Sequence, residues 1–133
     1  MHLFIIAPKN EPGSLATVLE AVAQKGVNVT TGGGAAWGEA SAIAFQVNDD
    51  DGARSALQEI GASFREADVA AAWLDDRPGT LADAARRLAD AGVNIEGLVP
   101  IGMKDGKVGI LFGVDNAEAA KTALGDLVGA AAG

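Results

Sequence analysis

The pattern of apolar and polar positions is similar in the two halves of the chain. Apolar runs at residues 3–7 and 69–74 have the length of β-strands and end in polar loops that contain proline. Apolar residues then recur at the i, i+3, i+4, i+7 spacing of an amphipathic helix. They are Leu15, Val18, Leu19 and Val22 in the first half and Leu81, Ala84, Ala85 and Leu88 in the second. Each half is therefore predicted to start with a strand followed by a one-sided helix.

The rest of each half predicts a strand hairpin, a second helix and a fourth strand. Gly26 and Gly92 follow the first helices, where a left-handed C-cap favours glycine. The hairpins are expected to turn near Trp37-Gly38 and at Asp105-Gly106, the latter a strong two-residue turn signal. The second helices are predicted over residues 49–60 and 116–127, and the fourth strands over 62–67 and 128–133. Because residues 128–133 are mostly alanine and glycine, the second half is predicted to have a weak last strand.

The two halves form an internal repeat. A shift of 66 residues places Pro12-Gly13 on Pro78-Gly79, and the Gly-Val-Asn-Val of residues 26–29 on the Gly-Val-Asn-Ile of residues 92–95. The same shift is expected to place Phe45 on Leu111 and Asp49 on Asp115. We predict an α+β protein of two tandem βαββαβ units, residues 1–67 and 68–133, each a ferredoxin-like antiparallel sheet with helices on one face.

The predicted strands are apolar at successive positions, as in residues 3–6. A sheet with helices on one face only should alternate between apolar and polar side chains. We therefore expect the second face to be covered by another sheet, from the other unit or from another chain, and we predict a homodimer.

Composition excludes several classes of function. A net charge of −8 and a pI near 4.4 oppose binding to nucleic acid. The chain has no cysteine and one histidine, His2, so we predict no metal site, no cofactor and no catalytic residues. It shows neither a signal peptide nor an apolar stretch long enough to cross a membrane, so we expect a cytoplasmic protein without a membrane partner.

The loop before the first helix is the candidate binding site. Residues 10–14 read Asn-Glu-Pro-Gly-Ser and lead into a helix whose first backbone N–H groups can donate hydrogen bonds to a carboxylate. Asn10 adds an amide, and Asn28 is expected to lie beside this loop and add a second. Two amides and a helix N-terminus suit an α-amino acid, although Pro-Gly before a helix and asparagine after a helix-ending glycine are also common structural features.

The motif Asn-x-Pro-Gly-x-Leu, followed after ten residues by Gly-Val-Asn-Val, resembles the ACT family of regulatory domains. The resemblance covers nearly all of both halves and implies that an amino acid effector binds at the interface between two such units. By this resemblance Asn10, Gly13 and Asn28 are candidate ligand residues in the first unit. The matching positions in the second unit are Asp76, Gly79 and Asn94. Asp76 departs from the pattern, because a carboxylate there would repel the carboxylate of an effector.

The leading hypothesis is a non-catalytic, amino-acid-binding protein that regulates itself or a separate enzyme. One alternative is an assembly module without a ligand. A second is an acylphosphatase-like hydrolase, because that family has the same element order and uses an arginine and an asparagine that Arg77 and Asn94 loosely match. The Gly32-Gly33-Gly34 run is interpreted as a bulge or a close backbone approach, with a ligand-facing role as the alternative.

Overall fold

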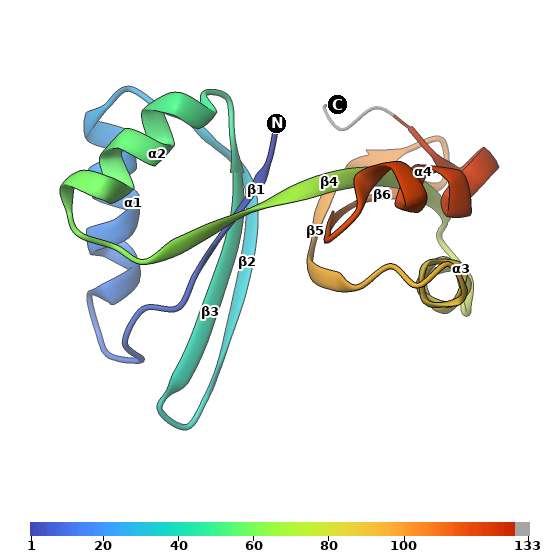
Figure 1. Cartoon of the computed structure of the whole chain (residues 1–133), viewed down its shortest axis with the longest axis horizontal. Coiled ribbons are helices and arrows are strands. Elements are labelled where there is room, and N and C mark those ends of the chain that lie inside the picture. Colours follow the sequence, from blue (N-terminus) through green and yellow to red (C-terminus); the bar gives the residue numbers. More distant parts are fainter. Residues whose placement is uncertain (130–133) are drawn as a thin grey trace. The chain divides into compact units, whose positions relative to one another are not determined.

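The computed structural model describes residues 1–129, and the chain divides into two compact units, Met1–Glu66 and Ala67–Gly133 (Figure 1). Unit 1 follows the βαββαβ order that the repeat predicts, and unit 2 follows it through its second helix; in each unit the helices lie on one face of the strands. Within residues 1–129 no helix is long and apolar enough to span a membrane.

Unit 1 is a sheet with the strand order β2-β3-β1-β4 and two helices. Its elements are β1 (Leu3–Ile6), α1 (Ser14–Gln24), β2 (Val29–Trp37), β3 (Ala40–Val47), α2 (Asp50–Glu59) and the start of β4 (Phe64–Asp75). Strand β3 pairs antiparallel with both β1 and β2. The helix-side core is built around Phe4, whose ring lies 5.8 Å from that of Phe45 and 6.0 Å from that of Phe64.

Unit 2 repeats this arrangement with the strand order β4-β6-β5. Its remaining elements are α3 (Thr80–Asp90), β5 (Ile95–Lys104), β6 (Lys107–Val114), α4 (Ala117–Leu124) and a 3-10 turn (Gly125–Leu127). The hairpin turn at Asp105-Gly106 has positive φ at both residues, as the sequence predicts. The weak last strand is reduced to one bridge between Ala72 and Val128 in the part of the chain that is described, and residues 130–133 of that prediction lie outside it.

The predicted boundary between two separate strands is wrong. The fourth strand of unit 1, expected at residues 62–67, and the first strand of unit 2, expected at 69–74, are a single strand, β4. Glu66 is the last residue of unit 1 and Ala67 the first of unit 2, so β4 belongs to both units. The reason is that no proline, glycine or turn sequence separates the two apolar runs, so nothing interrupts the extended backbone.

The offset between equivalent residues of the two units changes inside the hairpin. Phe45 pairs with Phe4, whereas Ala70, the counterpart of Phe4, pairs with Phe112 and not with Leu111. The helix-capping residue that corresponds to Asp49 is accordingly Asn116 and not Asp115. The physical cause is a bulge: β2 has one register shift against β3, while β5 has two against β6, and the second takes up the additional residue.

Candidate functional site

A hollow of about 450 Å³ lies in unit 1 between the β1–α1 loop, helix α1 and the β2–β3 hairpin. The loop contributes Lys9, Asn10 and Glu11 to its lining, and all three are exposed. Leu15 and Leu19 line it from α1, and the two strands contribute mostly glycine, alanine and apolar side chains. The hollow thus joins a polar loop to an apolar interior.

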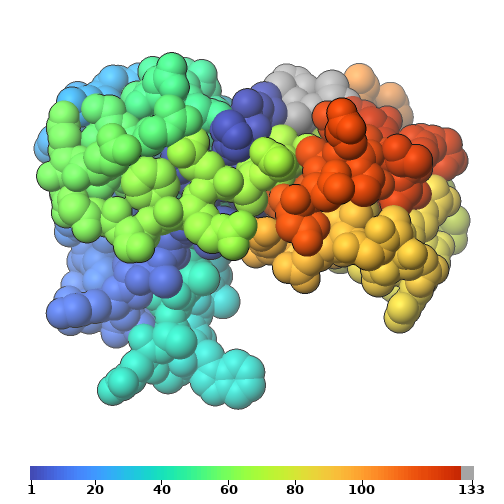
Figure 2. Space-filling view, viewed as in Figure 1, coloured from blue at the N-terminus to red at the C-terminus, as the bar shows by residue number. Residues whose placement is uncertain are grey.

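Two hydrogen bonds fasten the loop to the far end of the hairpin. The Asn10 side chain donates through Nδ2 to the carbonyl of Gly38 at 2.7 Å, and the Ser41 hydroxyl donates to the carbonyl of Pro8. Figure 2 shows the end of the hairpin, in cyan, projecting from unit 1. Asn10 therefore holds the loop against the hairpin turn and keeps Oδ1, its acceptor atom, for another partner.

Helix α1 begins at this loop without a side-chain cap. Its N-cap is Gly13, whose φ of 91° is a left-handed conformation that favours glycine. The first turn carries no acidic residue, whereas the first turn of α3 in unit 2 carries Asp83. The partial positive charge of the α1 N-terminus is therefore not offset within that turn.

The hairpin wall of the hollow is built from small residues on the helix-facing side. Gly32, Gly34 and Ala36 pair with Phe45, Ile43 and Ser41, and directly paired residues share a face of the sheet. A Cβ atom added to Gly34 would lie 2.6 Å from Cγ2 of Ile43, so the strands approach closely there. The register shift expected at the glycine run lies just before it, between Val29 and Thr31.

The structure does not bring Asn28 to the loop, contrary to the expectation from the sequence. The backbone of Asn28 exchanges hydrogen bonds with Asn48, accepting from its N–H at 3.1 Å and donating to its Oδ1 at 2.9 Å. Asn28 precedes the first residue of β2, while Gly38, the partner of Asn10, follows the last. The nine residues of β2 separate them. Helix α1 runs along the sheet. The loop before the helix and the start of β2 after it therefore lie at opposite ends of the sheet.

Unit 2 has a smaller hollow, about 240 Å³, at the corresponding loop. Asp76 and Gly79 line it, and the backbone N–H of Asp76 donates to the carbonyl of Gly106 in the hairpin turn. Asn94 lies at the other end of β5, where its N–H donates to Oδ1 of Asp115 at 3.0 Å. The residues predicted to form the second site thus lie at two opposite ends of unit 2, as those predicted for the first site do in unit 1.

The charges around this second loop are paired with one another. Asp75 accepts from Nζ of Lys107 at 2.8 Å and lies 3.7 Å from Nε of Arg77. The hydrogen bond from Lys107, assisted by Arg77, lowers the pKa of Asp75. Arg77 and Asn94 lie at opposite ends of unit 2, so the arginine–asparagine pair of the hydrolase alternative is not assembled within this unit.

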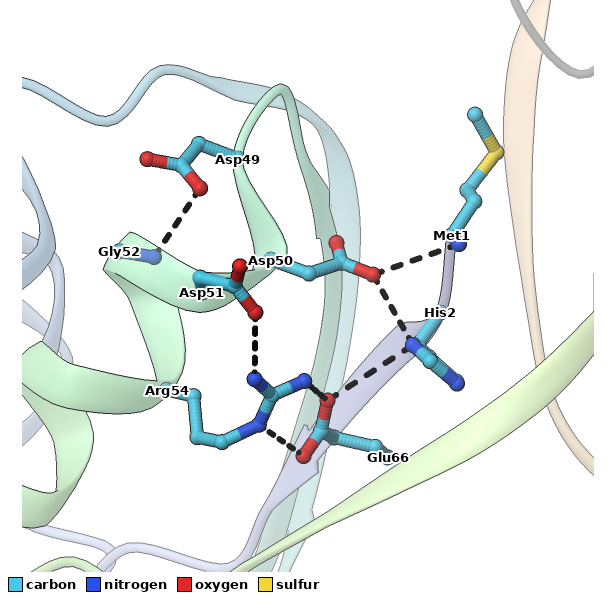
Figure 3. A network of polar contacts seen from close by, with 8 residues as sticks. All are labelled: Met1, His2, Asp49, Asp50, Asp51, Gly52, Arg54 and Glu66. Carbon is cyan, nitrogen blue, oxygen red and sulfur yellow. Dashed lines mark hydrogen bonds and ion pairs between the residues drawn. The ribbon is translucent and has the colours of Figure 1, made fainter.

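A separate charged network links the start of unit 1 to α2 and β4 (Figure 3). Arg54 donates from Nε at 2.8 Å and from Nη2 at 2.5 Å to the carboxylate of Glu66, and these bonds lower the pKa of Glu66. His2 contacts Asp50 at 2.9 Å and lies 3.7 Å from Glu66. Across residues 1–129 no group of three or more His, Cys, Asp or Glu side chains is placed to hold a metal. We interpret the network as structural.

Comparison with known proteins agrees with this architecture. Protein BT0572 from Bacteroides thetaiotaomicron has a similar fold, with a TM-score of 0.72 and 23% identity over 92% of this chain and 84% of its own. The ligand-free regulatory subunit of aspartate kinase from Thermus thermophilus gives a TM-score of 0.64 and 22% identity over 95% and 92%. That from Thermus flavus gives 0.62 and 24% over 92% and 88%.

No curated protein sequence matches the chain. A family model described as an ACT domain pair matches residues 1–126, nearly the whole length. Both repeats, and the loop and hairpin that form the hollow of unit 1, fall inside the matched region. This chain belongs to the ACT domain pair family.

Proposed function

We propose that this protein is a non-catalytic regulator that binds a small amino acid in the hollow of unit 1. The observation that carries the proposal is the composition of the hollow where the loop enters it. Lys9 and Glu11, two residues apart and of opposite charge, line the same hollow as the start of α1. A zwitterion presents one group of each sign and matches this arrangement.

Each charged group of an α-amino acid has a partner of suitable chemistry at this loop. The carboxylate can accept hydrogen bonds from the uncapped N–H groups of α1 and is attracted by Lys9. The ammonium group can donate to Glu11 and to Oδ1 of Asn10. In unit 2 the position of Lys9 is taken by Asp75, which is already paired with Lys107, so unit 1 is the better candidate for binding.

The output of binding is proposed to pass through another protein. Two of the similar structures are regulatory subunits of aspartate kinase, which supports a role as a regulatory partner of an enzyme. We further propose that the chain acts in the cytoplasm as a homodimer. Neither nucleic acid nor a membrane is expected as a partner.

The test is a thermal-shift screen with each of the twenty standard amino acids, followed by calorimetric titration of the hits. A ligand that binds the native state raises the melting temperature by mass action. The variant Glu11→Gln should lose the shift, while Glu20→Gln, an equivalent change on an exposed residue of α1 outside the hollow, should keep it. A uniform blank, or equal binding by both variants, would contradict the proposal, and a blank would favour an assembly module.

A further inference from the structure

We propose that the amino acid bound in unit 1 has an aliphatic or aromatic side chain, which occupies the interior of the hollow. This inference rests on the proposed function and specifies its ligand class. It follows from two features of the structure: the distribution of polar and apolar groups along the hollow, and the difference between the two units.

The polar groups are confined to one end of the hollow. Lys9, Asn10 and Glu11 belong to the loop, and no charged residue lines the part between α1 and the strands. That part is formed by the apolar side chains of Leu15, Leu19, Val29, Ile43 and Phe45. A ligand whose head group engages the loop therefore directs its side chain between apolar walls.

The volume and lining together select the side chain. A volume of about 450 Å³ lies within the range of small-molecule sites, roughly 300–1,000 Å³. A charged side chain in this part of the hollow would lose some of its hydration without gaining a partner of opposite charge. An apolar side chain would instead be removed from water against Leu19, Ile43 and Phe45, which favours binding in proportion to its buried area.

Unit 2 shows that the fold does not require this space. By strand pairing, Leu98 occupies the place of Gly32, since Leu98 pairs with Phe112 as Gly32 pairs with Phe45. In the same way Pro100 stands opposite Ile110. The third equivalent position on this side of the strand is occupied by Met103 in unit 2 and by Ala36 in unit 1.

Three larger residues therefore stand on the helix-facing side of β5 where β2 has glycine, glycine and alanine. The hollow of unit 2 is about half as large, and its lining comes from β4, the following loop, α3 and β6. None of the three β5 residues lines that hollow, and Leu98 and Met103 are 46% and 72% exposed, so they do not fill it. The comparison shows instead that this edge strand can carry large side chains, so the small residues of β2 are a feature of unit 1.

The inference is tested by titrating the full chain with L-alanine, L-leucine, L-methionine, L-phenylalanine, L-aspartate and L-lysine. Affinity should rise with apolar size, by about fourfold for each buried methylene group. Leucine should accordingly bind at least tenfold more tightly than alanine, and aspartate and lysine more weakly than alanine. Tightest binding by aspartate or lysine would overturn the ligand class and leave the proposed function intact. Absence of binding by all twenty amino acids would overturn both.

A variant that fills the hollow tests where the side chain lies. Ala36→Leu places a larger group on the helix-facing side, as Met103 does in unit 2. It should reduce the preference for leucine over alanine at least fivefold, with unchanged circular dichroism. Ala40→Leu makes the same chemical change on the same hairpin outside the lining and should leave that preference unchanged. An unchanged preference in a folded Ala36→Leu protein would overturn the placement.

Discussion

The two asparagines of unit 1 offer a direct test of whether the effector site is complete within one unit. Asn10 lies at the hollow and Asn28 at the opposite end of β2. At roughly 3.3 Å per residue, the strand between them separates the two side chains by roughly 30 Å, far beyond the length of an amino acid. Substituting each asparagine by alanine should therefore have very different effects on binding.

Asn10→Ala removes the 2.7 Å bond from Nδ2 to the carbonyl of Gly38 and the acceptor offered to the ammonium group. A hydrogen bond of this kind contributes about 0.5–1.5 kcal/mol, which weakens binding about two- to tenfold. Asn28→Ala should change affinity less than twofold. It should also leave stability nearly unchanged, because the bonds that join Asn28 to Asn48 use the backbone atoms of Asn28.

Calorimetric titration of both variants tests whether the binding site lies within one unit, and their melting temperatures serve as the control for folding. A loss of tenfold or more in a folded Asn28→Ala protein would refute a site confined to one unit. Affinity that also rose with protein concentration would then show that Asn28 reaches the ligand from a second copy, which is the arrangement that the resemblance to ACT domains implies.

Three further predictions concern stability. The rings of Phe4 and Phe64 are in contact, so a double-mutant cycle of Phe4→Leu and Phe64→Leu should show a coupling energy of about 0.5–1.5 kcal/mol in urea unfolding. Strictly additive effects of the two substitutions would contradict this. Nε2 of Gln46 is buried without a hydrogen-bond partner, so Gln46→Met should raise the free energy of unfolding by about 1 kcal/mol. Destabilisation by this substitution would show that Nε2 has a hydrogen-bond partner. Because Arg54 lowers the native pKa of Glu66 below 4.5, their interaction stabilises the protein above about pH 4.5, and this contribution is lost as pH falls through the native pKa. Glu66→Gln should flatten the decline in unfolding free energy on acidification, and an unchanged pH profile would disprove the contribution.

Element order and type were predictable from the sequence because local signals agree with the fold. Gly26 and Gly92 both adopt positive φ after the helices that they were expected to end. The merging of two predicted strands into β4 was missed, although the absence of proline, glycine or a turn sequence between residues 62–67 and 69–74 favours one strand. What the sequence does not indicate is which unit each residue of that strand joins. The register change was also not apparent from the sequence. A shift of 66 residues aligns equivalent residues of the two units up to Asn94, and it fails to do so only after the bulges of β5.

The candidate site was only partly predictable, and the reason is geometric. The loop was found because Pro-Gly before a helix leaves a local signal, and Asn10 and Gly13 do lie at the hollow or its edge. Asn28 was misplaced because its distance from the loop depends on the direction of α1 across the sheet. The glycine run was singled out with a ligand-facing role as one alternative, but the wall that Gly32, Gly34 and Ala36 form becomes visible only when strand pairing shows which side of β2 faces the helix.

The glycines of β2 have a stability cost that close packing of the strands, tightest at Gly34, explains only in part. Glycine inside a strand is less favourable than alanine by roughly 0.5–1 kcal/mol, so Gly32, Gly33 and Gly34 together cost roughly 1.5–3 kcal/mol. None of the three has the positive φ that would require glycine. Unit 2 carries Leu98, Val99 and Pro100 in the equivalent pairings, so its own β5–β6 hairpin accommodates larger side chains. Local features that work against stability are expected at functional sites, and here they coincide with the larger hollow, which supports the proposed binding site.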